Sequence, residues 1–294
     1  MLERYVIHTT KLCNMSCSYC YEKDKTSTYT WEEIEALLKN IAEQNKEKEC
    51  SIEFLGGEPL IAFDHIKKSV EYLENIEGFY VDHYIITTNG TLINDKIIDW
   101  LKANPKVMVG VSLDGGKVAN QLRVYKAKGR ATYEDVARNT KWLLEEIGSD
   151  RVSCHLVTHP WNVYLLSKSV KHIYNLGVRH FSIGIIESTG PITREYADRF
   201  IQEMHKISNY VKRGELPGAV IDLFDYLKPI SDVRKYIRDP ETGKVLGESY
   251  GRSESDITHT DIYDTVNTTS PVAETIAQMR EQVYTNHQVN MREV

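Results

Sequence analysis

The sequence has few cysteines, no long apolar segment and no excess of positive charge. Five cysteines among 294 residues are too few and too unevenly placed for a disulfide framework. No apolar run approaches the roughly 20 residues that a membrane helix needs, and the start of the chain lacks the basic and apolar regions of a signal peptide. The 36 Lys and Arg residues are outnumbered by 42 Asp and Glu residues, which gives a net charge of -6. We therefore expect a cytoplasmic protein that binds neither nucleic acid nor a membrane.

Short β-branched or apolar runs alternate with segments of helical periodicity. Hydrophobic residues make up 41% of the chain, enough for a sizeable core. We predict strands over residues 5–9, 51–55, 83–88, 107–113, 152–158 and 180–186. We predict helices over residues 30–45, 64–73, 95–102, 133–147 and 165–176. This alternation predicts an α/β fold with a parallel sheet, either an open doubly wound sheet or a closed or partial barrel.

The rhythm changes after about residue 190. A long helix is predicted over residues 193–212, and a turn signal at 239–243 lies between two short extended runs. The polar stretch 253–270 is expected to be irregular, and a last helix is predicted over 272–284. The chain shows no internal repeat. We therefore expect a first domain over residues 1–190 and a C-terminal extension over 191–294.

Three cysteines fall within eight residues, directly after the first predicted strand. Cys13, Cys17 and Cys20 are separated by three residues and then by two. Three thiolates in such a loop can bind one face of a cubane iron–sulfur cluster and leave the fourth iron without a protein ligand. Structural zinc normally needs four protein ligands, and Cys50 and Cys154 fall on other elements without paired spacing. An open iron–sulfur site is favoured, and zinc is the alternative.

The cysteine spacing after a first strand resembles the signature of radical S-adenosylmethionine enzymes. A second motif agrees with it, because Gly56, Gly57, Glu58 and Pro59 end the second predicted strand and resemble the Gly-Gly-Glu-Pro element of that superfamily. Alone, this motif would be an ordinary turn. The resemblance implies one [4Fe-4S] cluster and S-adenosylmethionine as cofactors, and it implies that Gly56, Gly57 and Glu58 hold the methionine amino group. Carbonyls and a carboxylate on a turn suit an ammonium, and glycine permits the close approach.

Two more stretches fit the same resemblance at the ends of the third and fourth predicted strands. It implies that Asn89 and Ser112 contact the ribose and carboxylate of S-adenosylmethionine. It also implies that Arg123 holds the methionine carboxylate and that Tyr19 packs beside the adenine. Simpler interpretations stay open, namely helix-capping residues, a surface arginine and an aromatic residue that shields the cluster from water.

The resemblance covers roughly residues 5–186 and implies a partial (β/α)6 TIM-like barrel with its site at the C-terminal mouth of the strands. The nearest branch resembles the enzymes that modify peptides and proteins, including the anaerobic sulfatase-maturating enzymes. It implies that a reducing partner such as flavodoxin or ferredoxin supplies an electron, and that a 5'-deoxyadenosyl radical takes a hydrogen atom from a peptide or protein. The alternatives are the same chemistry on a small-molecule metabolite, or a non-catalytic metal-binding regulatory protein of the same fold.

The chain also departs from that branch. No cysteine follows Cys154, so we expect no auxiliary cluster of the SPASM or twitch type, although residues 239–245 resemble the hairpin of that module. Leu55 occupies a position that is polar in sulfatase-maturating enzymes, so sulfatase maturation is not expected. Cys154 could give a hydrogen atom to a substrate radical, but a buried structural cysteine is favoured. His155 and His159 lack a third ligand and are interpreted as ordinary polar positions.

Overall fold

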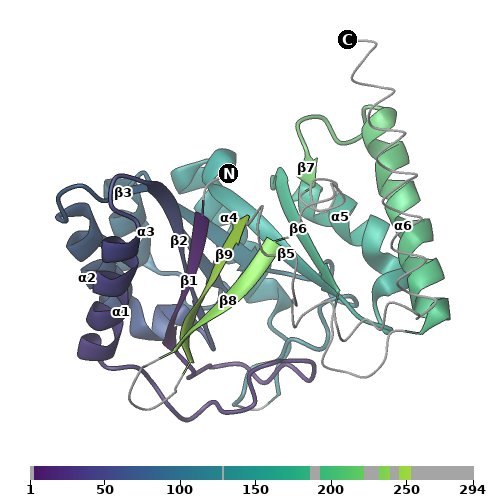
Figure 1. Ribbon diagram of the computed structural model, residues 1–294. Coiled ribbons are helices and arrows are strands. Elements are labelled where there is room, and N and C mark those ends of the chain that lie inside the picture. The colour runs from purple at the N-terminus through teal and green to yellow at the C-terminus, as the bar shows by residue number, and fades with distance from the viewer. Residues whose placement is uncertain (1–2, 128, 186–192, 222–231, 239–244, 253–294) are drawn as a thin grey trace, which may run out of the picture.

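The strands form one curved sheet (Figure 1). The computed structural model describes residues 3–127, 129–185, 193–221, 232–238 and 245–252. The last two of these segments are described by their backbone only. Along the sheet the strand order is β7-β6-β5-β4-β3-β2-β1-β9-β8. The strands are β1 (Glu3–Thr10), β2 (Glu49–Gly56), β3 (Tyr80–Thr88), β4 (Val107–Ser112), β5 (Val152–Thr158), β6 (His180–Ile185), β7 (Val220–Ile221), β8 (Asp232–Arg238) and β9 (Val245–Arg252).

Strands β1 to β7 are parallel, and each is hydrogen-bonded to its neighbours in sequence order. The helices between them are α1 (Trp31–Gln44), α2 (Phe63–Glu74), α3 (Asp95–Ala103), α4 (Tyr133–Ile147), α5 (Leu166–Asn175) and α6 (Arg194–Lys212), with short 3-10 turns at Pro59–Ala62, Ser149–Arg151 and Val163–Leu165. In the described part of the chain β1 and β7 do not pair, so the barrel is not closed. The predicted α/β partial TIM-like barrel is therefore confirmed.

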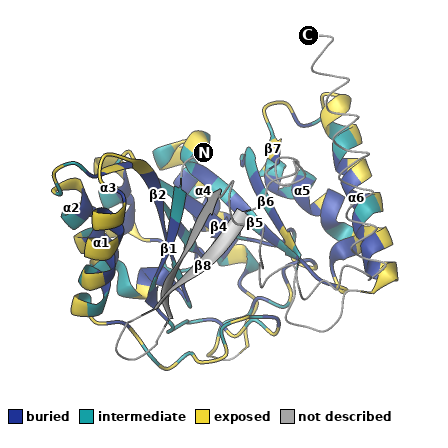
Figure 2. Ribbon diagram, in the orientation of Figure 1, coloured by how far each residue is buried: buried dark blue, intermediate teal, exposed yellow. Residues whose placement is uncertain are grey.

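The helices form where apolar residues recur at helical spacing beside a good cap. Thr30 caps α1 through a reciprocal capping box with Glu33, and Ile34, Leu38 and Ile41 on one stripe are buried against the sheet. Figure 2 shows the same division on α1 and α2, whose outer faces are exposed and whose inner faces are buried. The six predicted strands and the first five helices are all present, with boundaries shifted by at most three residues.

The two faces of the parallel sheet differ in burial and polarity. Side chains that point toward the helices are apolar and fully buried, such as Phe54, Val109 and Phe181. Alternate residues point to the other side, which we call the inner face. Many of these are half-buried, and the polar ones are Arg4, His8, Ser51, Glu53, His83, Thr87, Ser112, Ser153, His155, His180 and Ser182. A closed TIM barrel fills this space with branched apolar side chains, whereas here the inner face is polar and partly reached by solvent.

Cys154 lies on the helix-facing side of β5. Its side chain is completely buried and belongs to the apolar core together with Val111 and Phe181, its neighbours on the adjacent strands. Burial raises the pKa of this thiol. A thiol in this layer points away from the inner face, which favours the structural interpretation over hydrogen-atom donation.

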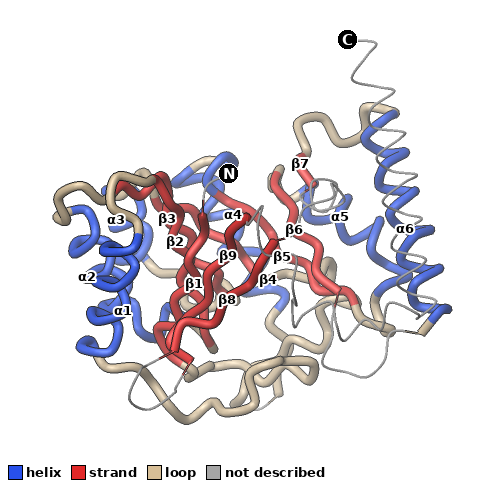
Figure 3. The backbone as a smooth tube through the Cα atoms, viewed as in Figure 1, coloured by secondary structure: helices blue, strands red, loops and turns tan. Residues whose placement is uncertain are grey.

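Elements after residue 190 extend both edges of the sheet, as the tube in Figure 3 shows. The predicted helix over 193–212 is α6, with Thr193 as its cap, and the unpredicted strand β7 pairs with β6. The two extended runs that flank the predicted turn are β8 and β9, which pair antiparallel, and β9 also pairs antiparallel with β1. The turn itself, the stretch 253–270 and the predicted last helix lie outside the described residues. The domain boundary at residue 190 stays a prediction.

In the part of the chain that the structure describes, no helix combines the length and the apolarity needed to cross a bilayer.

Candidate functional site at the mouth of the barrel

Cys13, Cys17 and Cys20 lie in one loop, residues 11–20, that follows β1 and is called the cysteine loop below. A second segment, which follows β4, pairs with it. The Ser16 N–H donates to the carbonyl of Val124 at 2.9 Å, and the Lys126 N–H donates to the carbonyl of Asn14 at 2.9 Å. Met15, between these bonds, is almost completely buried. The loop is therefore held by backbone hydrogen bonds at the C-terminal ends of the strands.

The three thiols are half-buried and close enough to influence one another electrostatically. Burial is the main cause that raises the pKa of both Cys13 and Cys17, and the Arg123 guanidinium partly opposes the rise at Cys17. A metal displaces the protons of the thiols that bind it, so a raised pKa does not prevent these cysteines from acting as ligands.

The sequence leaves two metal groups open for the cysteine loop, an iron–sulfur cluster and zinc. Among the described residues, no three His, Cys, Asp or Glu side chains converge closely enough to hold a single metal ion. Structural zinc needs four ligands within about 2.3 Å of one ion. Three thiolates that bind three different irons of a cubane lie further apart. The loop supplies three thiols, which is one ligand fewer than structural zinc needs and the number that an open cubane cluster needs.

Gly56 and Gly57 let the end of β2 pack directly on the start of the cysteine loop. The Gly57 N–H donates to the Thr10 carbonyl at 2.8 Å, and the Glu58 N–H donates to the Leu12 carbonyl at 2.8 Å. A Cβ atom at Gly56 would lie 2.1 Å from the Thr10 carbonyl oxygen, and one at Gly57 would lie 2.3 Å from the Leu12 oxygen. Gly56 also has a φ of 140°, which favours glycine. The two glycines are therefore needed for backbone-to-backbone contact.

Glu58 is completely buried and its carboxylate accepts three hydrogen bonds. The Thr88 hydroxyl donates at 2.6 Å, the Asn89 N–H at 2.7 Å and the Leu60 N–H at 3.1 Å. Burial nevertheless raises the pKa of Glu58 to about 7, because three donors only partly replace the lost water. A buried carboxylate with this pKa is well suited to meet a cation.

Asn89 connects the end of β3 to the cysteine loop. Its side-chain amide donates to Asn14 Oδ1 at 2.9 Å and approaches Cys13 Sγ at 3.9 Å. Its own oxygen accepts from the Thr91 hydroxyl at 2.6 Å and from the Thr91 N–H at 3.0 Å. Asn89 is thus next to both Cys13 and Glu58, although its amide already holds the loop.

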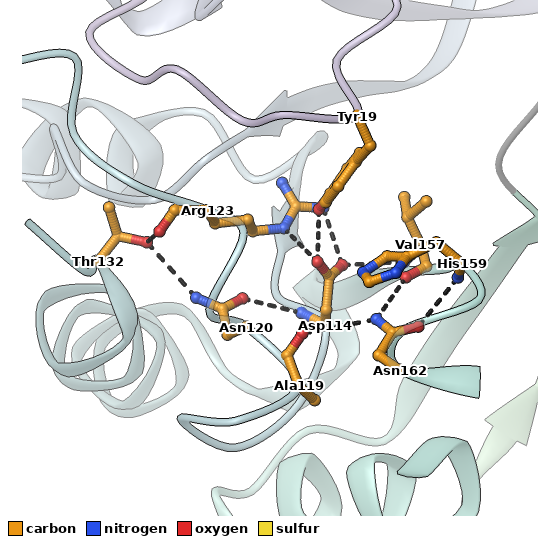
Figure 4. A network of polar contacts seen from close by, with 9 residues as sticks. All are labelled: Tyr19, Asp114, Ala119, Asn120, Arg123, Thr132, Val157, His159 and Asn162. Carbon is orange, nitrogen blue, oxygen red and sulfur yellow. Dashed lines mark hydrogen bonds and ion pairs between the residues drawn. The ribbon is translucent and has the colours of Figure 1, made fainter. Parts of the chain in front are cut away.

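Asp114 is the centre of a buried network that includes two of the predicted contacts (Figure 4). Arg123 donates to both carboxylate oxygens, from Nε at 2.9 Å and from Nη2 at 2.9 Å, and the Tyr19 hydroxyl donates to Oδ2. The Arg123 guanidinium lies 5.3 Å from the centre of the Tyr19 ring. Nε and Nη2 therefore bind Asp114, and Nη1 makes no hydrogen bond within the part of the chain that the structure describes. Asp114 was not selected from the sequence, although its motif was.

His159 lies beside this network, just past the end of β5. Its ring is 5.4 Å from that of Tyr19, and the Trp161 N–H donates to Nδ1 at 3.1 Å. Burial lowers the pKa of His159, so the ring is neutral and carries its proton on Nε2. His159 is only 2% exposed, and Nε2 has no hydrogen-bond partner among the described residues. The sequence predicts an ordinary polar position for His159, whereas the structure shows a buried donor that has no acceptor among the described residues.

The predicted site residues thus gather at one end of the barrel. In the view of Figure 1 this end is the lower one. Ser112 ends β4 with its side chain on the inner face, where it is half-buried, and its register partner on β5 is His155. The half-buried thiols, the glycine contact and the free donor of His159 fit a cluster and a bound polar molecule. Buried polar groups without a partner are rare unless a ligand completes them.

The sequence is similar to a known protein family and to individual proteins of archaea. The model of the radical SAM superfamily matches residues 7–163, more than half of the chain. The chain is 29% identical over 229 residues to the uncharacterized protein MJ0907 of Methanocaldococcus jannaschii, covering 76% of this chain and 75% of that protein. It is 31% identical over 189 residues to the probable GTP 3',8-cyclase of Methanopyrus kandleri, covering 63% of this chain and 57% of the cyclase.

Two solved structures share the fold at low sequence identity. The structure of anSMEcpe with bound AdoMet and Cp18Cys peptide superposes with a TM-score of 0.65 at 20% identity, covering 76% of this chain and 64% of that one. Streptococcus suis SuiB bound to precursor peptide SuiA gives 0.57 at 17% identity, covering 78% and 52%. The chain thus spans less than two thirds of either structure.

The five cysteines should separate into two classes in the metal-free protein. Cys50 and Cys154 are completely buried, and burial raises the pKa of Cys50 to about 12. We expect a thiol-specific reagent to label the three loop cysteines in the native protein and the other two only after unfolding. Mass spectrometry of the labelled peptides measures this. Labelling of Cys154 in the native protein would contradict its place in the core.

The stability of the metal-free protein should depend on pH through Glu58. The folded protein keeps the Glu58 proton up to about pH 7, whereas the unfolded chain loses it near 4.5. The folded state therefore binds more protons in this window, and the free energy of unfolding falls as pH rises through it. Glu58→Gln removes this titration. Between pH 4.5 and 7, the free energy of unfolding of the wild type, measured with a denaturant, should fall by up to about 3 kcal/mol relative to that of the variant. A difference between the two proteins that does not change with pH would refute the burial argument.

Tyr19 should hold the cysteine loop closed through its bond to Asp114. Loss of a buried hydrogen bond to a charged group costs about 1.5–3 kcal/mol, so Tyr19→Phe should release iron from the reconstituted protein to a chelator about tenfold faster. Tyr84→Phe is the matched control, because Tyr84 is also buried and donates to Glu74 at 2.9 Å, away from the loop. Equal release rates in the two variants would show that Tyr19 does not hold the loop.

Proposed function

Because the chain belongs to the radical SAM superfamily, we propose that it cleaves S-adenosylmethionine at the barrel mouth and removes a hydrogen atom from a peptide or protein. The observation that carries the first part is the packing of the cysteine loop against Gly56, Gly57 and Glu58. When bound by Cys13, Cys17 and Cys20, a [4Fe-4S] cluster would supply one electron to S-adenosylmethionine, which yields methionine and a 5'-deoxyadenosyl radical.

Each of the other residues at the mouth has a task in this proposal. Glu58 and the backbone at Gly56 and Gly57 hold the methionine amino group. Ser112 and the free Nη1 of Arg123 face its carboxylate and the ribose, and Tyr19 packs beside the adenine. Asn89 keeps the cysteine loop on the end of β3 through Asn14. The buried network around Asp114 excludes water from this side of the loop, which protects a radical from quenching.

The polarity of the inner face supports a peptide as the substrate. Among the residues of β1 to β6 that point to this face, Arg4 is the one lysine or arginine, and it is paired with Glu53 at 3.5 Å. A nucleoside triphosphate is normally bound by several arginines or lysines. The similar structures of anSMEcpe and SuiB each contain a bound peptide, which supports a peptide partner for this chain. The second candidate is a small metabolite, which the relation to the probable GTP 3',8-cyclase favours.

The first test is an anaerobic assay of the reconstituted protein with S-adenosylmethionine and dithionite. We expect about four irons per chain, as a cubane requires, together with 5'-deoxyadenosine. Cys17→Ala should lose both the iron and the product. Cys154→Ala is the matched control and should retain both, because Cys154 points into the core. Zinc in place of iron, or a cluster that gives no 5'-deoxyadenosine, would favour the non-catalytic alternative.

A further inference from the structure

Glu53 presents a buried carboxylate on the inner face of β2, three residues before Gly56. The Thr87 hydroxyl donates to its Oε1 at 2.7 Å. Its Oε2 lies 3.5 Å from Arg4 Nη1, which is longer than a good charge-assisted hydrogen bond. The side chain is only 8% exposed. Oε2 therefore retains the capacity to accept a stronger hydrogen bond from a bound group.

His155 presents an imidazole on the same face of β5. The ring lies across Gly110 of β4, where an added Cβ would come within 2.5 Å of His155 Nε2. Gly110 is the register partner of Thr87, which donates to Glu53, so the imidazole and the carboxylate lie over neighbouring positions of the inner face. Among charged groups, Glu53 has the largest electrostatic effect on His155, and Arg4 has the next largest. Burial nevertheless lowers the pKa of His155, so the ring is neutral with one donor and one acceptor nitrogen. His155 is half-buried, and no described residue makes a hydrogen bond to its ring.

Both groups lie on strands that end at the proposed site of S-adenosylmethionine. His155 is the register partner of Ser112 on β4. Glu53 and Gly56 belong to the same strand, and Glu53 pairs with Val6 of β1 below the start of the cysteine loop. A molecule that enters the inner face would therefore meet Glu53 and His155 next to the position where the radical forms.

We propose that Glu53 and His155 form a substrate subsite that binds a primary carboxamide, the side chain of asparagine or glutamine in a peptide. The inference rests on the proposed function and names the chemistry of its substrate. A terminal carboxamide presents two N–H donors and one carbonyl at the same end. The carboxylate of Glu53 accepts from the NH2 group, and an imidazole N–H donates to the carbonyl. Backbone amides point their N–H and C=O in opposite directions and cannot satisfy both partners from one end.

The charge balance of the subsite selects against ionised groups. Arg4 already neutralises Glu53, and His155 is uncharged, so a neutral polar group leaves no buried charge unpaired. An aspartate of the same shape would place a second carboxylate beside Glu53. A leucine of the same shape would leave Oε2 and the imidazole without partners, and each buried polar group left in this way lowers affinity.

The test uses three blocked peptides, acetyl-Gly-Xaa-Gly-N-methylamide, with perdeuterated asparagine, aspartate or leucine as Xaa. Each peptide is incubated with the reconstituted protein, S-adenosylmethionine and dithionite, and mass spectrometry measures deuterium in the 5'-deoxyadenosine. We expect transfer from the asparagine peptide at least about tenfold above that from the other two. The N-methylamide end avoids a second primary carboxamide in the probe.

Four variants of the subsite and one control variant assign any preference to Glu53 and His155. Glu53→Leu and His155→Phe should lower transfer from the asparagine peptide to the level of the leucine peptide. Gly110→Ala should act like His155→Phe because its Cβ displaces the ring. Glu53→Gln should retain much of the transfer, since its amide oxygen still accepts. Cys154→Ala, next to His155 but on the opposite face, should leave the preference unchanged.

The outcomes distinguish this inference from the function on which it rests. If 5'-deoxyadenosine forms but carries deuterium from none of the peptides, or equally from all three, the carboxamide subsite is wrong while cleavage of S-adenosylmethionine stands. The same holds if Glu53→Leu and His155→Phe keep the preference for asparagine. If no 5'-deoxyadenosine forms at all, the proposed function fails first. A variant that only unfolds is recognised by its lower thermal midpoint and by equal loss of transfer from every peptide.

Discussion

The direct contact between two backbones, at the end of β2 and at the start of the loop after β1, is the constraint on which the site depends. Parallel pairing of β1 and β2 brings Thr10 and Gly56 side by side. Because Gly56 and Gly57 have no side chain, their peptide groups can contact the backbone at the start of the cysteine loop. That contact fixes the start of the cysteine loop on the end of β2, and the segment after β4 holds its middle. Glu58 is carried into its buried position by the same turn, so the start of the loop and the carboxylate are positioned by one interaction.

Much of the barrel could be predicted because its signals are local. Apolar stripes such as Ile34, Leu38 and Ile41, and the cap at Thr30, are readable in single segments. Strand β7 could not be found in this way, because two residues carry no periodicity and pair only once β6 is in place. The antiparallel join of β9 to β1 is likewise a contact between the two ends of the described chain, which no local pattern encodes.

For the site, the sequence identified the residue types but not their partners. The cysteines, the glycines and Glu58 follow from spacing and resemblance, and the structure brings them together. Arg123 was expected to face a ligand, yet most of its guanidinium binds Asp114, a pairing across nine positions that sequence spacing does not reveal. The unpartnered Nε2 of His159 depends on the backbone of Trp161 fixing the tautomer, which only coordinates can show. Glu53 and His155 become a pair only when β2 and β5 curve around one inner face.

An unclosed sheet has two edges, and edges invite pairing between molecules. Among the described strands, the edge at β7 is only two residues long, too short to template a partner strand. The other edge, β8, has the sequence DVRKYIR, in which four of seven residues are charged. Short length and charge are two of the devices by which natural sheets resist edge-to-edge aggregation. An open barrel of this kind therefore leaves its inner face accessible while both described edges resist pairing with a second molecule, and substitutions that neutralise β8 would weaken that resistance at one edge.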